Sequence, residues 1–218
     1  MNNKKLSLVL FDFHNVLSRG RFYSTIEHSH PEIYKKIMQR LFAPESYDFI
    51  AKWMRGELSY EEVHAIISDE VGASVEFLNE SLITSVKQIE LNSELFEFSQ
   101  KIRSSGVLVA VLTDNMDIFS EVYVPYMGLD KKFDHIFSSS VQKKLKLDNN
   151  GEFIFDAISY MKVDVENTLF IDDFIDNGTP IKNAGGLFYH YDKYVDGHRD
   201  FLSWFENSFQ LASENTKI

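Results

Sequence analysis

The second half of the chain alternates short apolar runs with helix-like stretches, and this alternation restricts the possible folds more than any other feature. The apolar runs predict strands near residues 107–112, 134–137, 168–171 and 187–190. Helices are predicted near residues 117–126, 153–161 and 180–184, with a last helix from about residue 200. Strands separated by helices favour a doubly wound parallel sheet. An early apolar run at residues 6–11 adds a strand with the composition of one covered on both faces. The predicted fold class is therefore α/β.

The residues between the first two predicted strands show helix signals and no obvious strand. Pro31 and Pro44 each suit the first turn of a helix. Ser59, followed by Glu62, fits a capping box. Ser74 is a further candidate cap. This region is therefore predicted to be helical.

The predicted organisation has two parts. Residues 1–17 and 92–218 form the sheet core, and Asn92 caps the helix with which the core resumes. Residues 18–91 form an inserted all-helical cap. The chain has no Gly/Ser/Pro-rich linker, so the insertion must use short connections. We expect the cap to lie over the carboxyl edge of the sheet, where open α/β sheets bind their ligands.

Charge and composition exclude several classes of function. Lys and Arg total 22 against 33 Asp and Glu, giving a formal charge of −11. Such a surface repels phosphate backbones, so we expect no nucleic-acid partner. There is no cysteine, and therefore no disulfide, thiolate zinc site or cysteine nucleophile. No early apolar stretch is long enough for a signal peptide or a membrane span. We expect a cytoplasmic monomer or weak homodimer with a small-molecule partner and no membrane contact.

Acidic and polar residues follow three of the predicted strands. They are Asp12 after the first, Thr113, Asp114 and Asn115 after the second, and Asp172 and Asp173 after the strand near residue 170. The carboxyl ends of parallel strands face one crevice, so several carboxylates would share one site. Each close pair costs roughly 4 kcal/mol of repulsion at about 4 Å with an effective dielectric constant near 20. A divalent cation relieves this repulsion, and oxygen ligands without a His/Cys cluster favour Mg²⁺ over zinc.

The same residues resemble the motifs of the haloacid dehalogenase (HAD) superfamily. Residues 8–17 (LVLFDFHNVL) resemble its first motif, an apolar strand followed by Asp-x-Asp-x-Val-Leu. Residues 111–115 (VLTDN) resemble the second, and residues 168–173 (TLFIDD), with Asn177, resemble the Asp-Asp form of the fourth. Residues 53–59 (WMRGELS) are similar to a stretch common in the helical caps of the family. The resemblance implies a Rossmann-like core with a helical cap inserted after the first motif.

The resemblance also implies an activity, that of a Mg²⁺-dependent phosphatase acting on a small phosphorylated metabolite. Asp12 would be the nucleophile and would form an aspartyl-phosphate that water then hydrolyses. Mg²⁺ would be bound by Asp12, the backbone carbonyl of His14 and Asp173, with Asp172 acting directly or through water.

Further residues follow from the second and third motifs. Thr113 and the amides of Asp114 and Asn115 would hold the non-reacting phosphoryl oxygens. The third motif supplies a lysine, and its match is loose because residues 142–148 (QKKLKLD) lack the usual Lys-Pro pair. Lys146 fits best and Lys144 is the rival.

His14 is the main departure from the family pattern, because phosphatases of the family usually have a second Asp at this position. Its ordinary pKa of about 6.5 suits proton transfer to the leaving group, although nearby Mg²⁺ disfavours the charged form that donates. The alternative is that His14 contributes only its carbonyl to the metal. Three other functions stay open: a metal-free dehalogenase, which the doubled Asp172-Asp173 argues against, a phosphotransferase or mutase, and a catalytically weak phosphate-binding protein.

Overall fold

A five-stranded parallel sheet forms the centre of the molecule, as the sequence predicts. The computed structural model describes residues 6–192 and 197–209. The strands are β1 (Leu8–Phe11), β4 (Leu108–Thr113), β5 (His135–Ser138), β6 (Thr168–Asp172) and β7 (Leu187–His190), in the order β5-β4-β1-β6-β7. β1 lies in the middle, and its Phe11 is in register with Val111 of β4 and Ile171 of β6. The α/β fold class is confirmed.

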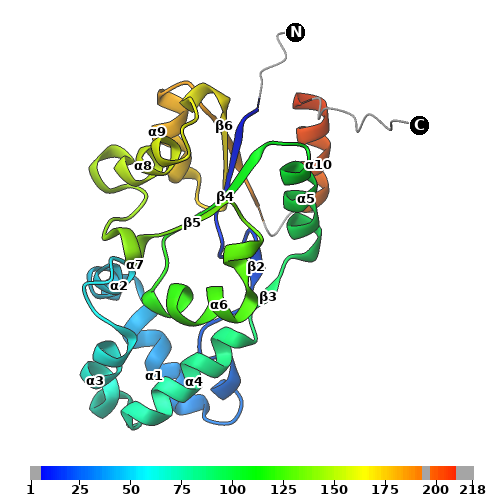
Figure 1. Ribbon diagram of the computed structural model, residues 1–218. Coiled ribbons are helices and arrows are strands. Elements are labelled where there is room, and N and C mark those ends of the chain that lie inside the picture. Colours follow the sequence, from blue (N-terminus) through cyan, green and yellow to red (C-terminus); the bar gives the residue numbers. More distant parts are fainter. Residues whose placement is uncertain (1–5, 193–196, 210–218) are drawn as a thin grey trace.

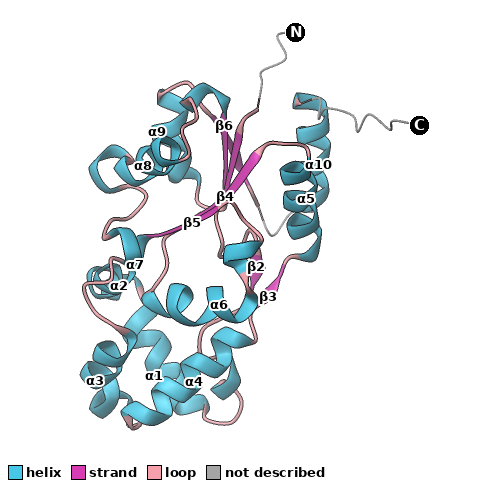
Figure 2. Cartoon of the chain, in the orientation of Figure 1, coloured by secondary structure: helices cyan, strands magenta, loops and turns pink. Residues whose placement is uncertain are grey.

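Helices cover both faces of this sheet (Figure 2). One face carries α5 (Ser93–Ser104) and α10 (Gly197–Ser208). The two helices contact each other through the rings of Phe98 and Phe201, whose centroids are 5.1 Å apart. The other face carries α8 (Glu152–Tyr160) and α9 (Gly178–Asn183). Each face of the sheet has its own hydrophobic core, and alternate side chains of β1 pack into one or the other. Val9 belongs to the core under α5 and α10, and Leu10 to the core under α8 and α9. This period of two explains why β1 is apolar at every position.

Four helices between β1 and β4 pack together beyond one end of the sheet (Figure 1). They are α1 (Pro31–Phe42), α2 (Tyr47–Met54), α3 (Tyr60–Val71) and α4 (Val75–Lys87), and are called the helical segment below. Their predicted starts are confirmed where a cap defines them. Ser59 and Glu62 form a reciprocal capping box, and the Ser74 hydroxyl accepts a hydrogen bond from the amide of Phe77.

Three details of the chain differ from the sequence prediction. Two short strands, β2 (Ser18–Arg19) and β3 (Glu90–Leu91), pair antiparallel where the chain enters and leaves the region of the helical segment. Pro44 begins a 3-10 turn, and α2 starts only at Tyr47. The helix predicted near residues 117–126 is a π-helical turn over Phe119–Tyr123 followed by α6 (Val124–Met127). A two-residue strand has no periodicity that a sequence could display, which is why β2 and β3 were not predicted.

The boundaries predicted for core and cap stay a prediction, and residues 1–5, 193–196 and 210–218 of the predicted core lie outside the described part of the chain. Across residues 6–192 and 197–209, no helix has the length and apolar character needed to cross a membrane.

Candidate active site

The carboxyl ends of the three central strands bring the predicted site residues together. Asp12 directly follows β1, and its amide donates a hydrogen bond to the carbonyl of Ile171 (2.8 Å). Thr113 is the last residue of β4 and Asp172 the last of β6. Because β4, β1 and β6 are neighbours in a parallel sheet, these side chains belong to one edge, and all three are buried. The helical segment lies beyond the same edge (Figure 1).

Lys146 connects two of these strands through its ammonium group. Its Nζ donates to Asp12 Oδ1 and to Asp172 Oδ2, each at 2.7 Å, and its side chain is 2% exposed. Lys144, the rival in the sequence, forms ion pairs with Glu152 and Asp156 instead. Of the two lysines, Lys146 is therefore the one that reaches the carboxylates at the sheet edge.

Three carboxylates form a cluster that could hold a metal ion. Asp12, Asp172 and Asp173 each offer one oxygen, and these three atoms lie within 4.8 Å of one another. Asp172 is held in place by Asn177 Nδ2 (2.9 Å) and by the amide of Phe174 (2.8 Å). When all three carboxylates are ionised, the cluster carries three negative charges against the single ammonium of Lys146. All-oxygen ligands of this kind fit Mg²⁺.

The second acidic residue, Asp173, is positioned by Asn15. Asn15 Nδ2 donates to Asp173 Oδ2 at 2.8 Å, across 158 residues of sequence. Asn15 has φ +63°, a left-handed conformation that asparagine adopts more readily than most residues. The turn after β1 therefore orients a side chain that follows β6.

The pKa values of the carboxyl groups at this edge show that they lack compensating positive charge. Burial raises the pKa of Asp12 to about 7, the neighbouring Asp172 and Asp173 add to the rise, and Lys146 opposes it. Burial likewise raises the pKa of Asp114 to about 6. Burial disfavours the charge on Lys146, but its carboxylate neighbours, Asp12 first, outweigh this effect and raise its pKa. Further positive charge would stabilise the ionised carboxylates.

The residues at the end of β4 differ in whether their polar groups already have hydrogen-bond partners. The Thr113 hydroxyl is fully buried and has no hydrogen-bond partner among the described residues. The Asp114 carboxylate accepts from the amide of Lys146 (3.0 Å). The amide of Asn115, expected from the sequence to hold a phosphoryl oxygen, donates in this arrangement to Ser139 Oγ (2.8 Å). Sequence could not show this, because α7 (Ser139–Gln142) approaches only in the folded chain.

The helical segment is docked on the loop that carries Lys146. Arg55, just after α2, forms a bidentate ion pair with Asp148, at 2.6 and 2.8 Å. The adjacent Gly56 has φ +61°, and a Cβ there would lie 2.3 Å from the carbonyl oxygen of Ser140. Glycine is therefore required at this contact.

Asp117 forms a second connection between the helical segment and the sheet core. Its Oδ1 accepts from Trp53 Nε1 (2.7 Å) and its Oδ2 accepts from the amide of Tyr60 (2.9 Å). One carboxylate after β4 thus binds both α2 and the start of α3.

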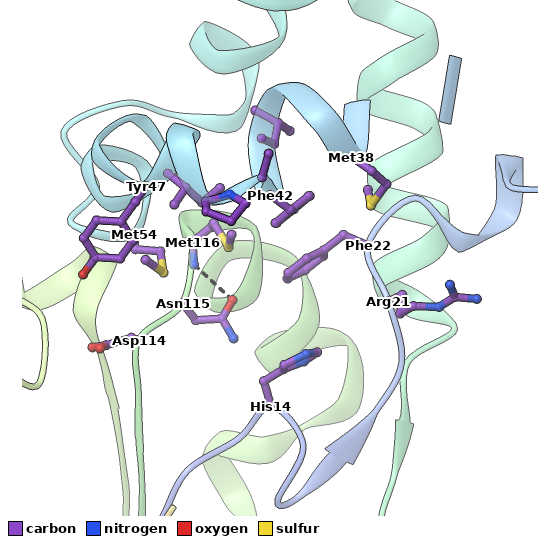
Figure 3. A pocket seen from close by; sticks show the side chains of 14 residues that line it. His14, Arg21, Phe22, Met38, Phe42, Tyr47, Met54, Asp114, Asn115 and Met116 are labelled. Carbon is purple, nitrogen blue, oxygen red and sulfur yellow. Dashed lines mark hydrogen bonds between the residues drawn. The ribbon is translucent and has the colours of Figure 1, made fainter. Parts of the chain in front are cut away.

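A cavity of about 600 Å³ lies between the helical segment and the sheet edge (Figure 3). His14, Asp114 and Asn115 form its polar end. The His14 ring is nearly parallel to that of Phe22, with centroids 6.4 Å apart. Asn115 Oδ1 accepts from the amide of Met116 (3.0 Å), and Figure 3 shows the Asn115 side-chain nitrogen on the side of His14. The side chain of His14 therefore faces this cavity.

Sequence reasoning overlooked several residues that shape the site. The sequence contained an indication of the role of Asn15, because asparagine in the turn after the first-motif strand suits a left-handed conformation. The pairing of Arg55 with Asp148 spans 93 residues and had none. The catalytic and metal-binding roles assigned to Asp12, His14, Lys146, Asp172 and Asp173 stay predictions that this geometry supports.

Comparisons with known proteins agree with the fold. The family model for haloacid dehalogenase-like hydrolases matches residues 6–185. No curated protein matches the chain. A predicted HAD-like family hydrolase from Porphyromonas gingivalis has 17% sequence identity and a TM-score of 0.64, covering 90% of this chain and 98% of that one.

Two further solved structures differ in what they bind. A HAD family enzyme from Bacteroides thetaiotaomicron, in complex with magnesium and inorganic phosphate, has 17% identity and a TM-score of 0.67, covering 90% of this chain and 99% of its own. The L-2-haloacid dehalogenase from Xanthobacter autotrophicus, with chloropropionic acid covalently bound, has 15% identity and a TM-score of 0.58, covering 84% and 76%. At these identities the likeness concerns the fold.

Proposed function

Because the chain belongs to the haloacid dehalogenase-like hydrolases, we propose that it is a Mg²⁺-dependent phosphatase of small phosphorylated molecules, with Asp12 as nucleophile. One observation carries the proposal: Asp12, Asp172 and Asp173 offer oxygens within 4.8 Å of one another, and the ammonium of Lys146, which contacts Asp12 and Asp172, balances only one of their three negative charges. Such a cluster suits a cation and a phosphoryl group better than a neutral carbon centre.

The proposed reaction consists of two displacements at phosphorus. In the first, Asp12 attacks, the ester P–O bond breaks, and the leaving alkoxide takes a proton, for which His14 is the proposed donor. In the second, water attacks the phosphorus of the aspartyl-phosphate, releasing inorganic phosphate and restoring the Asp12 carboxylate. Lys146 holds the Asp12 carboxylate in place at 2.7 Å and offsets charge on the phosphoryl group.

The phosphoryl oxygens need donors, and the buried Thr113 hydroxyl fits that need. A buried hydroxyl without a partner costs about 1–3 kcal/mol, which a bound phosphoryl oxygen would recover. The side-chain amide of Asn115 is a second candidate donor, in place of its backbone amide. We propose that these two groups orient the phosphoryl group.

The acidic cluster is proposed to bind Mg²⁺ through Asp12 and Asp173, with Asp172 acting directly or through water, and with the His14 carbonyl as a further ligand. When bound, Mg²⁺ neutralises the carboxylates and the phosphoryl oxygens. The magnesium and phosphate complex of the Bacteroides thetaiotaomicron enzyme supports this assignment. Asn15 then acts through Asp173, which it orients.

A dehalogenase is the competing function, and the fold is shared with one. The arrangement of Asp173 argues against it. An extra carboxylate, held next to Asp12 and Asp172 by the side chain of Asn15, raises repulsion at the site and has no use without a cation.

The helical segment is proposed to be the cap of the active site, and its ion pair with the loop that carries Lys146 supports this role.

A pair of assays tests the proposal. Phosphate release from p-nitrophenyl phosphate is measured with Mg²⁺ and with EDTA, and chloride release from 2-chloropropionate is measured under the same conditions. We expect Mg²⁺-dependent phosphate release and no chloride release. Chloride release, or phosphate release unaffected by EDTA, would disprove the assignment. Transfer to an added alcohol in preference to water would instead favour the phosphotransferase.

His14 is proposed to protonate the leaving group, because its ring faces the cavity where that group would lie. An aryl phosphate leaves without protonation, whereas an alkyl phosphate does not. We expect His14→Ala to reduce alkyl phosphate turnover by about 10²–10⁴-fold and aryl phosphate turnover less. Equal losses of turnover for both esters would contradict the acid role. His14 would then contribute only its backbone carbonyl to the metal, which is the alternative left open by the sequence.

A further inference from the structure

The walls of the cavity beyond its polar end are apolar. Helix α1 contributes Met38, Leu41 and Phe42, and α2 contributes Ile50 and Met54. The sheet side contributes Met116 next to Asn115. A volume of about 600 Å³ falls within the range of pockets that hold a small organic ligand. The polar end of the cavity is formed by His14, two residues after Asp12, and by Asp114 and Asn115, directly after Thr113, so the space next to these groups is large enough for more than a phosphate ion.

Polar partners for a sugar-like ligand are scarce among the described residues that line the walls. Away from the polar end, only Arg21 and Tyr47 have polar side chains. The Arg21 guanidinium is bound to Glu27 at 2.6 and 3.1 Å, and Figure 3 shows it directed away from the other lining side chains. Among the described lining side chains away from the polar end, Tyr47 is then the one left to pair with a ligand hydroxyl, so most hydroxyl groups of a polyhydroxylated ligand would lack a side-chain partner here, which disfavours binding.

The aromatic residues of the cavity are arranged for apolar contact. The rings of His14, Phe22 and Phe42 are nearly parallel, with interplanar angles of 9° and 10° and centroids 6.4 and 6.1 Å apart. The row runs from the polar end to Phe42 at the rim, which is partly exposed. Methionines on the facing walls are flexible and adapt to apolar groups. A chain or ring attached to a phosphate at Asp12 could lie along this row.

From these observations we infer that the substrate is a phosphate monoester of an apolar alcohol, whose hydrocarbon part occupies the cavity. The inference rests on the proposed phosphatase function, because it places the phosphoryl group at Asp12. It goes further by excluding sugar phosphates and other polyhydroxylated esters as preferred substrates. Each methylene buried in the cavity should increase affinity about fourfold.

The test measures binding first, so that it does not depend on turnover. The dissociation constants of ethyl-, butyl- and hexylphosphonate are measured by calorimetry with Mg²⁺ present. We expect affinity to increase about fourfold per methylene until the cavity is filled. In Phe42→Ser the increase per methylene should be smaller, and in Ile66→Ala, a control on an exposed apolar residue of α3 outside the cavity, it should equal that of the wild type. A flat series in the wild type, or an unchanged increase in Phe42→Ser, would overturn the inference.

Hydrolysis then separates the inference from the proposed function. The kcat/KM values of hexyl, 2-phenylethyl and glycerol phosphates are compared, since all are esters of primary alcohols. We expect the two apolar esters to exceed glycerol phosphate by about 10²-fold or more, and their ratio distinguishes a chain from a ring. Equal or better hydrolysis of glycerol phosphate would overturn the inference and leave the phosphatase intact. If no ester is hydrolysed, the proposed function fails, and the phosphonate series still decides what the cavity binds.

Discussion

Replacing Lys146 by methionine should both destabilise the protein and slow the reaction. The change retains an apolar stem but removes the ammonium that lies 2.7 Å from Asp12 and from Asp172. Removing one partner of a buried ion pair costs about 3–5 kcal/mol, because a buried charge is left unpaired. Asp12, whose pKa burial raises to about 7, can take up a proton, and this places the expected loss in the lower part of that range.

The assay is thermal unfolding in EDTA at neutral pH. For a chain of this length, about 3 kcal/mol corresponds to a decrease in Tm of roughly 6–12 °C. Mg²⁺ should recover part of the loss by supplying positive charge to the same carboxylates. Loss of one preorganised electrostatic group should lower kcat by about 10²–10³-fold.

Lys144→Met is the matched control, because Lys144 also has two carboxylate partners. Those partners are 43% and 54% exposed, so solvent screens the ion pairs and little stability depends on them. We expect its Tm and kcat to stay close to those of the wild type. Equal losses in the two variants, or a Lys146→Met protein as stable as the wild type in EDTA, would refute the electrostatic account of the site.

Three further predictions follow from single contacts. Asn15→Gly removes the hydrogen bond to Asp173 but keeps the left-handed backbone, and a Mg²⁺ titration of activity should show affinity lowered about 10–100-fold. Gly56→Ala should lower the free energy of unfolding by more than the roughly 1–2 kcal/mol cost of a left-handed alanine, because its Cβ would collide with the Ser140 carbonyl. His64 is buried and neutral, with its pKa lowered mainly by burial, so stability should decrease as pH falls below about 6.5, as followed by denaturant unfolding.

Each of these predictions has a control in the same chain. Asn150→Gly changes an exposed asparagine at φ +60° and should not alter Mg²⁺ affinity. Gly128→Ala has φ +61° with no atom within 4 Å of the added Cβ, so a loss equal to that of Gly56→Ala would contradict the collision.

For His64, the sign of the pH effect decides the test. The unfolded chain binds the proton more readily than the buried ring, so protonation favours unfolding. Its Nδ1–H tautomer satisfies both ring nitrogens, donating to Asn79 Oδ1 and accepting from the Tyr23 hydroxyl. Asp12, with a raised pKa, acts in the opposite direction, so the difference between wild type and His64→Gln is the measured quantity. A difference that does not change between pH 7 and pH 5 would contradict the prediction.

The sequence predicted the sheet because strand, cap and turn signals are local. The run ending at Asp12 and the capping box at Ser59 each occupy a few consecutive residues, and both were confirmed. The grouping of Asp12, Thr113 and Asp172 was also predictable, because parallel topology places strand ends at one edge.

The rest of the site depends on contacts between distant residues. The loose third motif favoured Lys146 over Lys144, but only the folded loop shows that Lys146 lies between Asp12 and Asp172. The amide of Asn115 was assigned to phosphate from its motif, but it binds Ser139 because α7 packs against that turn. The apolar cavity is likewise formed only when α1 and α2 meet the sheet edge.

The central claim is that Asp12 attacks phosphorus and that water then displaces it. The stereochemical course of hydrolysis tests this most directly, with a phosphorothioate ester made chiral by sulfur and two oxygen isotopes and hydrolysed in water that carries the third isotope. Two in-line displacements each invert the configuration, so the account predicts net retention at phosphorus. Inversion would show that water attacks the ester in one step and that Asp12 is not the nucleophile.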